Sequence, residues 1–234
     1  MNYPLFLLFG FIPSLIWLAF YLRKDSHPEP NSMIRKVFFW GMLATIPAIA
    51  LELSLRSLFS FLPFSEEIIL ILYIFLGVAL VEELLKFLVV RFSVYKNKAL
   101  DEPLDVMLYM IIAALGFAAL ENILILFGLG PSSPISNILA LTLMRLVGAT
   151  FLHALASGTF GYFLAHSFLD KKRKWRYFVV GLFLATLLHG LFNFYILKGD
   201  GAAKLLVPAI ILLGLAIFIS LGFRQLKKII KLRA

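Results

Sequence analysis

The chain has 234 residues, of which 62% are hydrophobic and only 15% are charged, and its mean hydropathy is +0.96. A soluble domain usually carries about a quarter of charged residues, so this composition excludes an ordinary soluble protein and predicts a polytopic membrane protein. The chain contains no cysteine, which excludes disulfide bonds, thiolate metal sites and a cysteine nucleophile.

Seven apolar segments follow one another along the chain, and each is long enough to cross a ~30 Å hydrocarbon core at 1.5 Å per residue. The runs are continuous rather than alternating, which favours an all-α protein over a β-barrel. We expect the fifth segment to be one tilted or kinked helix; splitting it would give an eighth span. The predicted spans are 3–22, 37–60, 67–93, 103–128, 136–169, 176–197 and 204–223.

Most of the 22 basic residues fall in alternate connections between these spans. The positive-inside rule then predicts that the N-terminus lies outside and the C-terminus in the cytoplasm. The net charge of +9 is explained by topology and by contact with the lipid bilayer, so no nucleic-acid partner is needed. The first span has no basic region before it and no small-residue cleavage site, so we interpret it as a retained helix. Residues 1–234 are predicted to form a single integral membrane domain.

Several polar side chains lie inside the spans, where an ionisable group costs a few kcal/mol and tends to face the bundle interior. Such groups are functional-site candidates unless a simpler pairing explains them. Glu52 and Arg56, four residues apart, have such an explanation, since this spacing predicts a local ion pair. The others are Glu82, Glu83, Lys86, Asp105, Glu121, Asn122, Arg145, His153, His189 and Asn193.

Glu82 and Glu83 are adjacent within an apolar run, and Lys86 follows them by four and three residues. We expect Lys86 to neutralise one carboxylate but not both, because neighbouring residues point ~100° apart around a helix. The other carboxylate is then available as a general base or acid. A purely structural ion cluster is the alternative. We favour Glu82 as the base and Glu83 as its orienting partner.

His189 and Asn193 lie on one helix face, and His153 lies in an earlier span beside small residues that permit close helix approach. Counting 1.5 Å per residue from the basic loops places Glu83, His153 and His189 at depths that allow them to meet. Interhelical hydrogen bonding without catalysis is the alternative for both histidines and for Asn193. Arg145, two turns before His153, is positioned to balance a carboxylate.

Two reaction types are open to this set of residues. In the first, a glutamate takes a proton from water, while a histidine and Asn193 stabilise the tetrahedral oxyanion. In the second, His153, His189 and either Glu82 or Glu83 bind Zn²⁺, and another glutamate is the base. The sequence has no HExxH motif, so a metal site would draw its ligands from separate helices.

Four motifs in order resemble the PrsW family of intramembrane proteases: EELLK at 82–86, DEPLDVMLYMIIAALGFAALEN at 101–122, HALASGTFGYFLA at 153–165 and HGLFN at 189–193. The resemblance covers about residues 66–195, the expected catalytic core. It implies that Glu82 and Glu83 are the family's glutamate pair, that His153 and His189 are its histidines, and that Asn193 is a ligand or oxyanion residue. Lys86, Glu121, Asn122 and Arg145 are then supporting residues.

The wider group includes CAAX-prenyl endopeptidases and bacteriocin-immunity membrane proteins. Lys86 and Ala149 stand where the CAAX branch has an arginine and an aromatic residue, which favours the PrsW branch. The resemblance implies a multi-pass protease of the plasma membrane that cleaves a membrane-anchored protein, such as an anti-sigma factor at its first cleavage site. It leaves the cofactor open between Zn²⁺ and none.

Two other functions remain open from the sequence. Embedded glutamates and histidines also form relays in proton- or ion-coupled transporters, although the chain shows no pair of matching interrupted helices. A non-catalytic, immunity-type scaffold would retain the fold with polar groups too dispersed to share one water molecule.

Overall fold

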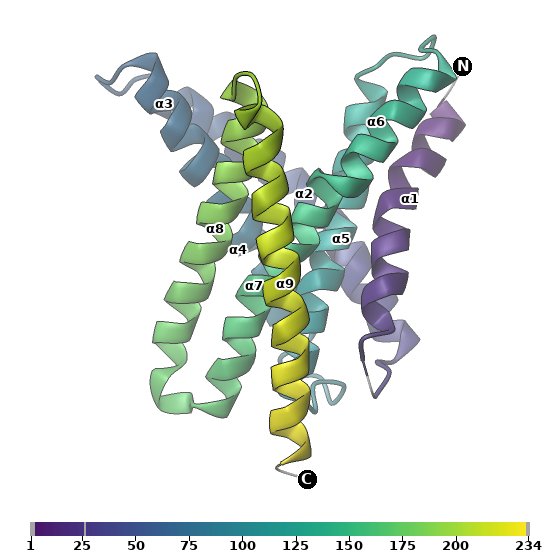
Figure 1. Ribbon diagram of the computed structural model, residues 1–234, viewed down its shortest axis with the longest axis vertical. Coiled ribbons are helices and arrows are strands. Elements are labelled where there is room, and N and C mark those ends of the chain that lie inside the picture. Colours follow the sequence, from purple (N-terminus) through teal and green to yellow (C-terminus); the bar gives the residue numbers. More distant parts are fainter. Residues whose placement is uncertain (1–2, 26, 233–234) are drawn as a thin grey trace.

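The computed structural model describes residues 3–25 and 27–232, and all regular structure in this part of the chain is helical. Seven of the helices are long and apolar enough to cross a membrane, which confirms the predicted all-α, seven-span fold. Figure 1 shows α1 beginning at one end of the bundle and α9 ending at the other. The direction in which the bundle crosses the membrane stays a prediction. The elements are α1 (Tyr3–Leu22), α2 (Asn31–Phe59), α3 (Glu66–Leu72), η1 (Tyr73–Ala79), α4 (Leu80–Ser93), α5 (Pro103–Phe127), α6 (Ile135–Val147), α7 (Ala149–Leu169), η2 (Lys171–Arg173), α8 (Lys174–Lys198) and α9 (Ala203–Lys231).

Two helices extend well beyond the apolar segments that predicted them. α2 begins at Asn31 rather than at residue 37, directly after Pro30, and α9 continues to Lys231 rather than ending at residue 223. Backbone hydrogen bonding does not stop at the membrane surface, so a helix continues through polar residues until a proline or another breaker ends it. These extensions carry basic side chains out of the apolar layer.

The long fifth segment forms α6 and α7, which are joined by a kink at Gly148, as predicted for a single kinked span. Gly148 has φ −105° and ψ −100°, outside the helical region. A Cβ atom at this position would lie 2.7 Å from the carbonyl oxygen of Met144, so the bend requires glycine.

α5 forms the centre of the bundle. Every residue from Leu104 to Ala119 is buried, which matches a sequence that is apolar all round the helix. The backbones of α2 and α5 touch where they cross. A Cβ atom on Gly41 would collide with the Ala113 carbonyl oxygen, and one on Gly116 with that of Phe38.

The third span changes helix type along its length. α3 leads into η1, a π-helix over Tyr73–Ala79, and α4 continues from it as an ordinary α-helix. π-helical turns are rare and are frequently found at functional sites. η1 ends three residues before Glu82, so it sets the rotation at which α4 presents its charged residues.

Three connections and the last turn of α9 gather at one end of the bundle, the lower end in Figure 1. The connections are those between α1 and α2, between α4 and α5, and between α7 and α8. Lysine and arginine are concentrated in these connections and in the last turns of α9, so we call this end of the bundle the basic end. The connections at the opposite end are poor in basic residues.

Candidate active site

α4 contributes three charged side chains to the interior of the bundle. Glu83 and Lys86 are fully buried, and Glu82 is only 4% exposed. Lys86 Nζ donates to Glu82 Oε2 at 3.1 Å and to Glu83 Oε1 at 2.8 Å. The expectation that Lys86 would neutralise only one glutamate is therefore wrong. Its long side chain runs between the two carboxylates, and its ammonium group has donors for both.

His189, on α8, is held by Glu83. Its Nδ1 lies 3.0 Å from Glu83 Oε1, and its Nε2 lies 3.9 Å from Glu82 Oε2. Because a carboxylate accepts hydrogen bonds, Nδ1 carries the proton and Nε2 keeps a free lone pair. A Cβ atom on Gly190 would collide with the ring of Phe75, so the neighbouring glycine allows α8 to lie against η1.

His153, on α7, is bonded on both sides of its ring. Lys86 Nζ lies 2.8 Å from Nδ1, and Glu121 Oε2 lies 2.9 Å from Nε2. The ammonium group donates and the carboxylate accepts, so the ring is neutral, with its proton on Nε2 and its lone pair on Nδ1. Nδ1 is also 3.5 Å from Glu82 Oε2. Both imidazoles therefore keep their lone-pair nitrogen within 4 Å of Glu82.

The six side chains described so far form what we call the central cluster: Glu82, Glu83, Lys86, Glu121, His153 and His189. They come from α4, α5, α7 and α8, and the rings of His153 and His189 are 5.0 Å apart. The depths estimated from the sequence allowed this meeting, and the structure brings the side chains into direct contact.

A second layer of polar side chains holds Glu121 and His153 in place. Arg145 Nη2 donates to Glu121 Oε2 at 2.8 Å, and Arg145 Nε is hydrogen-bonded to Asn122 Oδ1. Asn122 Nδ2 in turn donates to Thr150 Oγ1 at 3.0 Å. Arg145 therefore balances a carboxylate, as expected from the sequence, and Asn122 links α5 to α6 and α7.

Ser157 belongs to the cluster, although sequence reasoning missed it. Its Oγ is fully buried and donates to Glu83 Oε2 at 2.6 Å. With Lys86 and His189 on Oε1, Glu83 accepts three side-chain hydrogen bonds. The signal was the spacing of His153 and Ser157, four residues apart on one face of α7, in a run that we interpreted only as a packing surface.

Asn193 is the one predicted catalytic residue that stands apart. It lies one turn after His189 on α8 and is half-buried. Among residues 3–25 and 27–232, no hydrogen bond joins Asn193 to the central cluster. Its part in the reaction stays a prediction.

The local ion pair predicted for Glu52 and Arg56 is wrong. Within residues 3–25 and 27–232 the two side chains form no ion pair, and the Arg56 guanidinium instead lies 5.7 Å from the centre of the Tyr73 ring. An i,i+4 pair contributes only about 0.2–0.5 kcal/mol and a cation–π contact about as much, so the aromatic ring of η1 competes successfully.

The central cluster also has the donor set of a zinc site. One donor atom from each of Glu82, His153 and His189 lies within 4.8 Å of the other two. A tetrahedral Zn²⁺ with bonds of about 2.0–2.1 Å holds its ligands about 3.4 Å apart, close to the separations of 3.5 and 3.9 Å between Glu82 and the two lone-pair nitrogens.

The outer contacts of the two histidines fit the same interpretation. Each bonds a carboxylate through its other ring nitrogen, His189 to Glu83 and His153 to Glu121, and metal-ligating histidines are usually oriented in this way. The residues therefore fit a zinc ion, provided that Lys86 withdraws from His153 Nδ1.

Comparison with known proteins agrees with this geometry. The family model described as PrsW family intramembrane metalloprotease matches residues 29–221. Protease PrsW of Oceanobacillus iheyensis is 31% identical over 87% of this chain and 88% of its own length. Protease PrsW of Geobacillus kaustophilus is 32% identical over 82% and 79%, and that of Bacillus subtilis 28% over 79% of each. No solved structure matches the chain significantly. A buried glutamate–histidine site in a seven-span bundle and a family match over most of the chain lead to one conclusion: the chain belongs to the PrsW family of intramembrane metalloproteases.

Proposed function

We propose that this intramembrane protease cleaves a peptide bond with a water molecule activated in the central cluster. Glu82, Glu83, His153 and His189 are the catalytic residues of this proposal, and Asn193 joins them when substrate is bound. The observation that carries it is the meeting of two imidazole lone pairs and one carboxylate, Glu82, within 4 Å.

Glu82 is the proposed general base. The 3.9 Å between Glu82 Oε2 and His189 Nε2 is too long for a direct hydrogen bond, and one water molecule can bridge such a separation. A water held there would give its proton to Glu82 as its oxygen attacks the scissile carbonyl, and Glu82 would later pass that proton to the leaving amine. Glu83 is already bonded to Ser157, Lys86 and His189, so it orients His189 rather than taking a proton.

The oxyanion of the tetrahedral intermediate needs a hydrogen-bond donor. Asn193 is the proposed donor because its half-buried amide, one turn after His189, makes no other hydrogen bond within the described residues. The supporting residues act by positioning the catalytic ones, and they are Lys86, Glu121, Asn122 and Arg145. Lys86 balances the two glutamates, and the remaining three hold His153 at a fixed angle.

If a zinc ion is bound, Glu82, His153 and His189 would hold it, so Glu82 would then be a ligand rather than the base, and the ion would supply Lewis-acid polarisation of the carbonyl and a more acidic water. Glu83 and Glu121 would keep their present contacts with the outer nitrogens of the two histidines. Lys86 would then bond only the two glutamates.

The proposed substrate is a membrane-anchored protein, and an anti-sigma factor cleaved at its first site is the specific candidate. The plasma membrane is the proposed location, with the basic end in the cytoplasm. Within the central cluster, the Glu121 side chain is the most exposed, at 28%, so we propose that the scissile bond enters from that side.

The central cluster and the family match favour proteolysis over the two other functions. A transporter is expected to arrange its ionisable groups along a path, whereas these six side chains bond one another. A non-catalytic scaffold would have polar groups too dispersed to share one water molecule, and these groups lie within a few ångströms of each other.

The test is cleavage of a single-span anti-sigma factor, tagged at both ends, by the purified protein in liposomes. The wild type should release both tagged fragments, and His189→Ala should release neither, while Glu67→Gln, at an exposed position in the first turn of α3, should cleave normally. Equal cleavage by His189→Ala and wild type would refute the proposed site. Metal analysis of the same samples separates the two mechanisms, because zinc bound at one equivalent in wild type and lost in His189→Ala supports the metal form.

A further inference from the structure

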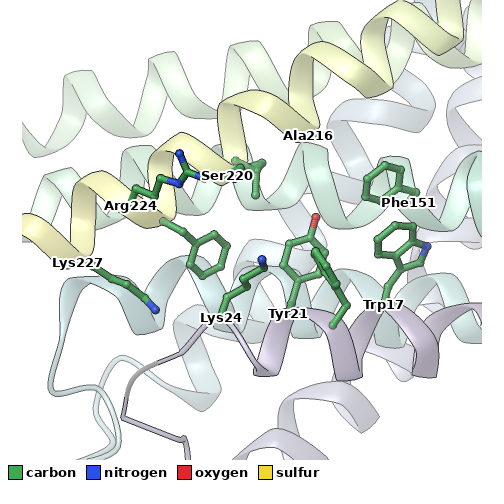
Figure 2. A pocket seen from close by; sticks show the side chains of 11 residues that line it. Trp17, Tyr21, Lys24, Phe151, Ala216, Ser220, Arg224 and Lys227 are labelled. Atoms are coloured by element: carbon green, nitrogen blue, oxygen red, sulfur yellow. The ribbon is translucent and has the colours of Figure 1, made fainter.

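A cavity lies between α1 and α9 toward the basic end, and none of its lining residues belongs to the central cluster. Its volume is about 340 Å³, and Phe151 of α7 forms part of its floor. Figure 2 shows Trp17 and Phe151 at one end of this cavity and Arg224 and Lys227 toward the other, with Tyr21 and Lys24 between them. The lining of the cavity therefore changes from aromatic to basic side chains along its length.

The end nearer the middle of the bundle is aromatic. The rings of Trp17 and Phe151 are stacked, with centroids 3.9 Å apart and planes 9° from parallel. The indole Nε1 of Trp17 already donates to the Leu146 carbonyl oxygen at 2.8 Å, so the ring offers the cavity an apolar surface and no free donor. This end suits a hydrocarbon chain.

The other end is positively charged. Lys24, Arg224 and Lys227 line it, and no ion pair neutralises any of the three within residues 3–25 and 27–232. Lys24 Nζ lies 4.7 Å from the centre of the Phe20 ring, a contact that leaves its positive charge in place. No Asp or Glu of the described residues lines the cavity. Three uncompensated cations around one space suit an anion such as a phosphate group.

The length of the cavity matches a molecule that has both a hydrocarbon chain and an anionic group. Along α9, the lining residues run from Ala216 to Lys227, a rise of about 16 Å, with the charged residues on the side of the basic end. Phe20 is 44% exposed on the outer surface of α1, so the cavity borders the part of the bundle that faces lipid. A free phosphate would leave the aromatic end unused, and a neutral lipid would leave the cations unpaired.

We propose that this cavity binds an anionic phospholipid, with its phosphate among Lys24, Arg224 and Lys227 and one acyl chain along Trp17 and Phe151. The site is separate from the catalytic one, and the inference does not depend on the proposed proteolysis.

Trp17 provides a direct reporter, because it is one of three tryptophans and the only one that lines the cavity. Trp40→Phe combined with Trp175→Phe leaves it as the single tryptophan of the full chain; both replaced residues are exposed. We would reconstitute this variant in vesicles containing either phosphatidylglycerol or phosphatidylcholine with brominated acyl chains, which quench indole fluorescence on contact. Phosphatidylglycerol should reach half-maximal quenching at a mole fraction about tenfold lower than phosphatidylcholine, given three basic groups.

The charge variants show whether the cavity itself makes this choice. Replacing Lys24, Arg224 and Lys227 with glutamine should remove the tenfold preference. The matched control replaces Lys171, Lys172 and Lys174 with glutamine, which removes the same charge from exposed positions at the same end and should leave the preference unchanged. Equal quenching by both lipids in the parent, or a preference that survives the cavity substitutions, would overturn the proposal.

A competition experiment distinguishes a bound lipid from a bound free phosphate. Inorganic phosphate added at the concentration of the lipid phosphate should leave the quenching by phosphatidylglycerol unchanged, because it cannot replace the acyl chain. Complete reversal of quenching would identify a free-anion site and overturn the lipid assignment.

Discussion

Among the residues that the structure describes, two clusters of mostly buried carboxylates differ in what their oxygen atoms bind. The central cluster joins Glu82 to two imidazoles whose lone-pair nitrogens lie nearby. The other, which we call the basic-end cluster, consists of Asp25, Glu29 and Asp105, and its oxygens are also close enough together to hold an ion.

The contacts of the basic-end cluster are structural. Asp105 Oδ2 accepts from the backbone N–H groups of Asp101 and Glu102, at 3.1 and 2.7 Å, and so caps the first turn of α5. Tyr109 Oη donates to Glu29 Oε2 at 2.5 Å, which fastens the connection after α1 to the central helix. The comparison teaches that burial of carboxylates does not by itself indicate catalysis. The nitrogen lone pairs beside a carboxylate distinguish the central cluster.

The largest effect is expected when one charge is removed from each cluster, which tests whether the two clusters differ in function. Glu82→Gln should lower the cleavage rate by about 10²–10⁴-fold, because the amide cannot accept the proton of the attacking water. Asp105→Asn retains an oxygen acceptor for the two N–H groups that it caps and should cleave within a few-fold of wild type. Rates on the same tagged substrate measure both. Similar losses in the two variants would mean that the clusters do not differ in function.

The next largest effect tests the positioning of Glu83. Ser157→Ala removes the hydroxyl that donates to Glu83 Oε2, which leaves the carboxylate freer to turn away from His189. Loss of such outer contacts typically costs about 10–100-fold in activity. We expect the loss to appear in kcat with KM little changed, because Ser157 does not reach the substrate. A change in KM alone would argue that Ser157 only supports packing.

The sequence predicted most of the fold because length and hydropathy determine a membrane helix. It also predicted which residues would meet, since an embedded Glu, Lys or His must find a partner. Glu82, Glu83, Lys86, His153 and His189 were identified in this way, and even the kink in the long fifth span followed from its length.

The remainder depended on contacts that residue type does not reveal. The apolar sequence of η1 does not distinguish a π-helix from an α-helix. The rotation that η1 imposes on α4 could therefore not be predicted. Ser157 looked like a small packing residue, and only the position of Glu83 gives it a partner. The extent of α2 and α9 beyond the apolar layer depends on where backbone hydrogen bonding ends, which hydropathy does not record.

A smaller effect sharpens the structural interpretation of the basic-end cluster. Tyr109→Phe removes the hydroxyl that donates to Glu29 and should lower the free energy of unfolding by about 1.5–3 kcal/mol, the range for a hydrogen bond to a charged group. Unfolding in mixed detergent and SDS measures this change, and the cleavage rate of the folded protein should not move. Tyr162→Phe is the matched control, because its hydroxyl bonds Gln225 at an exposed site and should matter by less than about 0.5 kcal/mol.

The smallest expected effect is a dependence of the basic end on pH. Burial raises the pKa of Glu29 above its ordinary value, and the nearby Asp25 and Asp101 raise it further, while the hydrogen bond from Tyr109 opposes the shift. A carboxyl group whose pKa is raised on folding stabilises the folded state fully below its unfolded pKa of about 4.3, and this stabilisation is lost as the pH rises through the folded value.

Hydrogen-exchange protection factors for the α1–α2 connection, corrected for the intrinsic rate at each pH, measure this loss. Protection should be greatest near pH 4 and should fall as the pH rises, and Glu29→Gln, which keeps an uncharged side chain at every pH, should make this fall smaller. A profile that rises with pH, or one that Glu29→Gln leaves unchanged, would contradict the assignment.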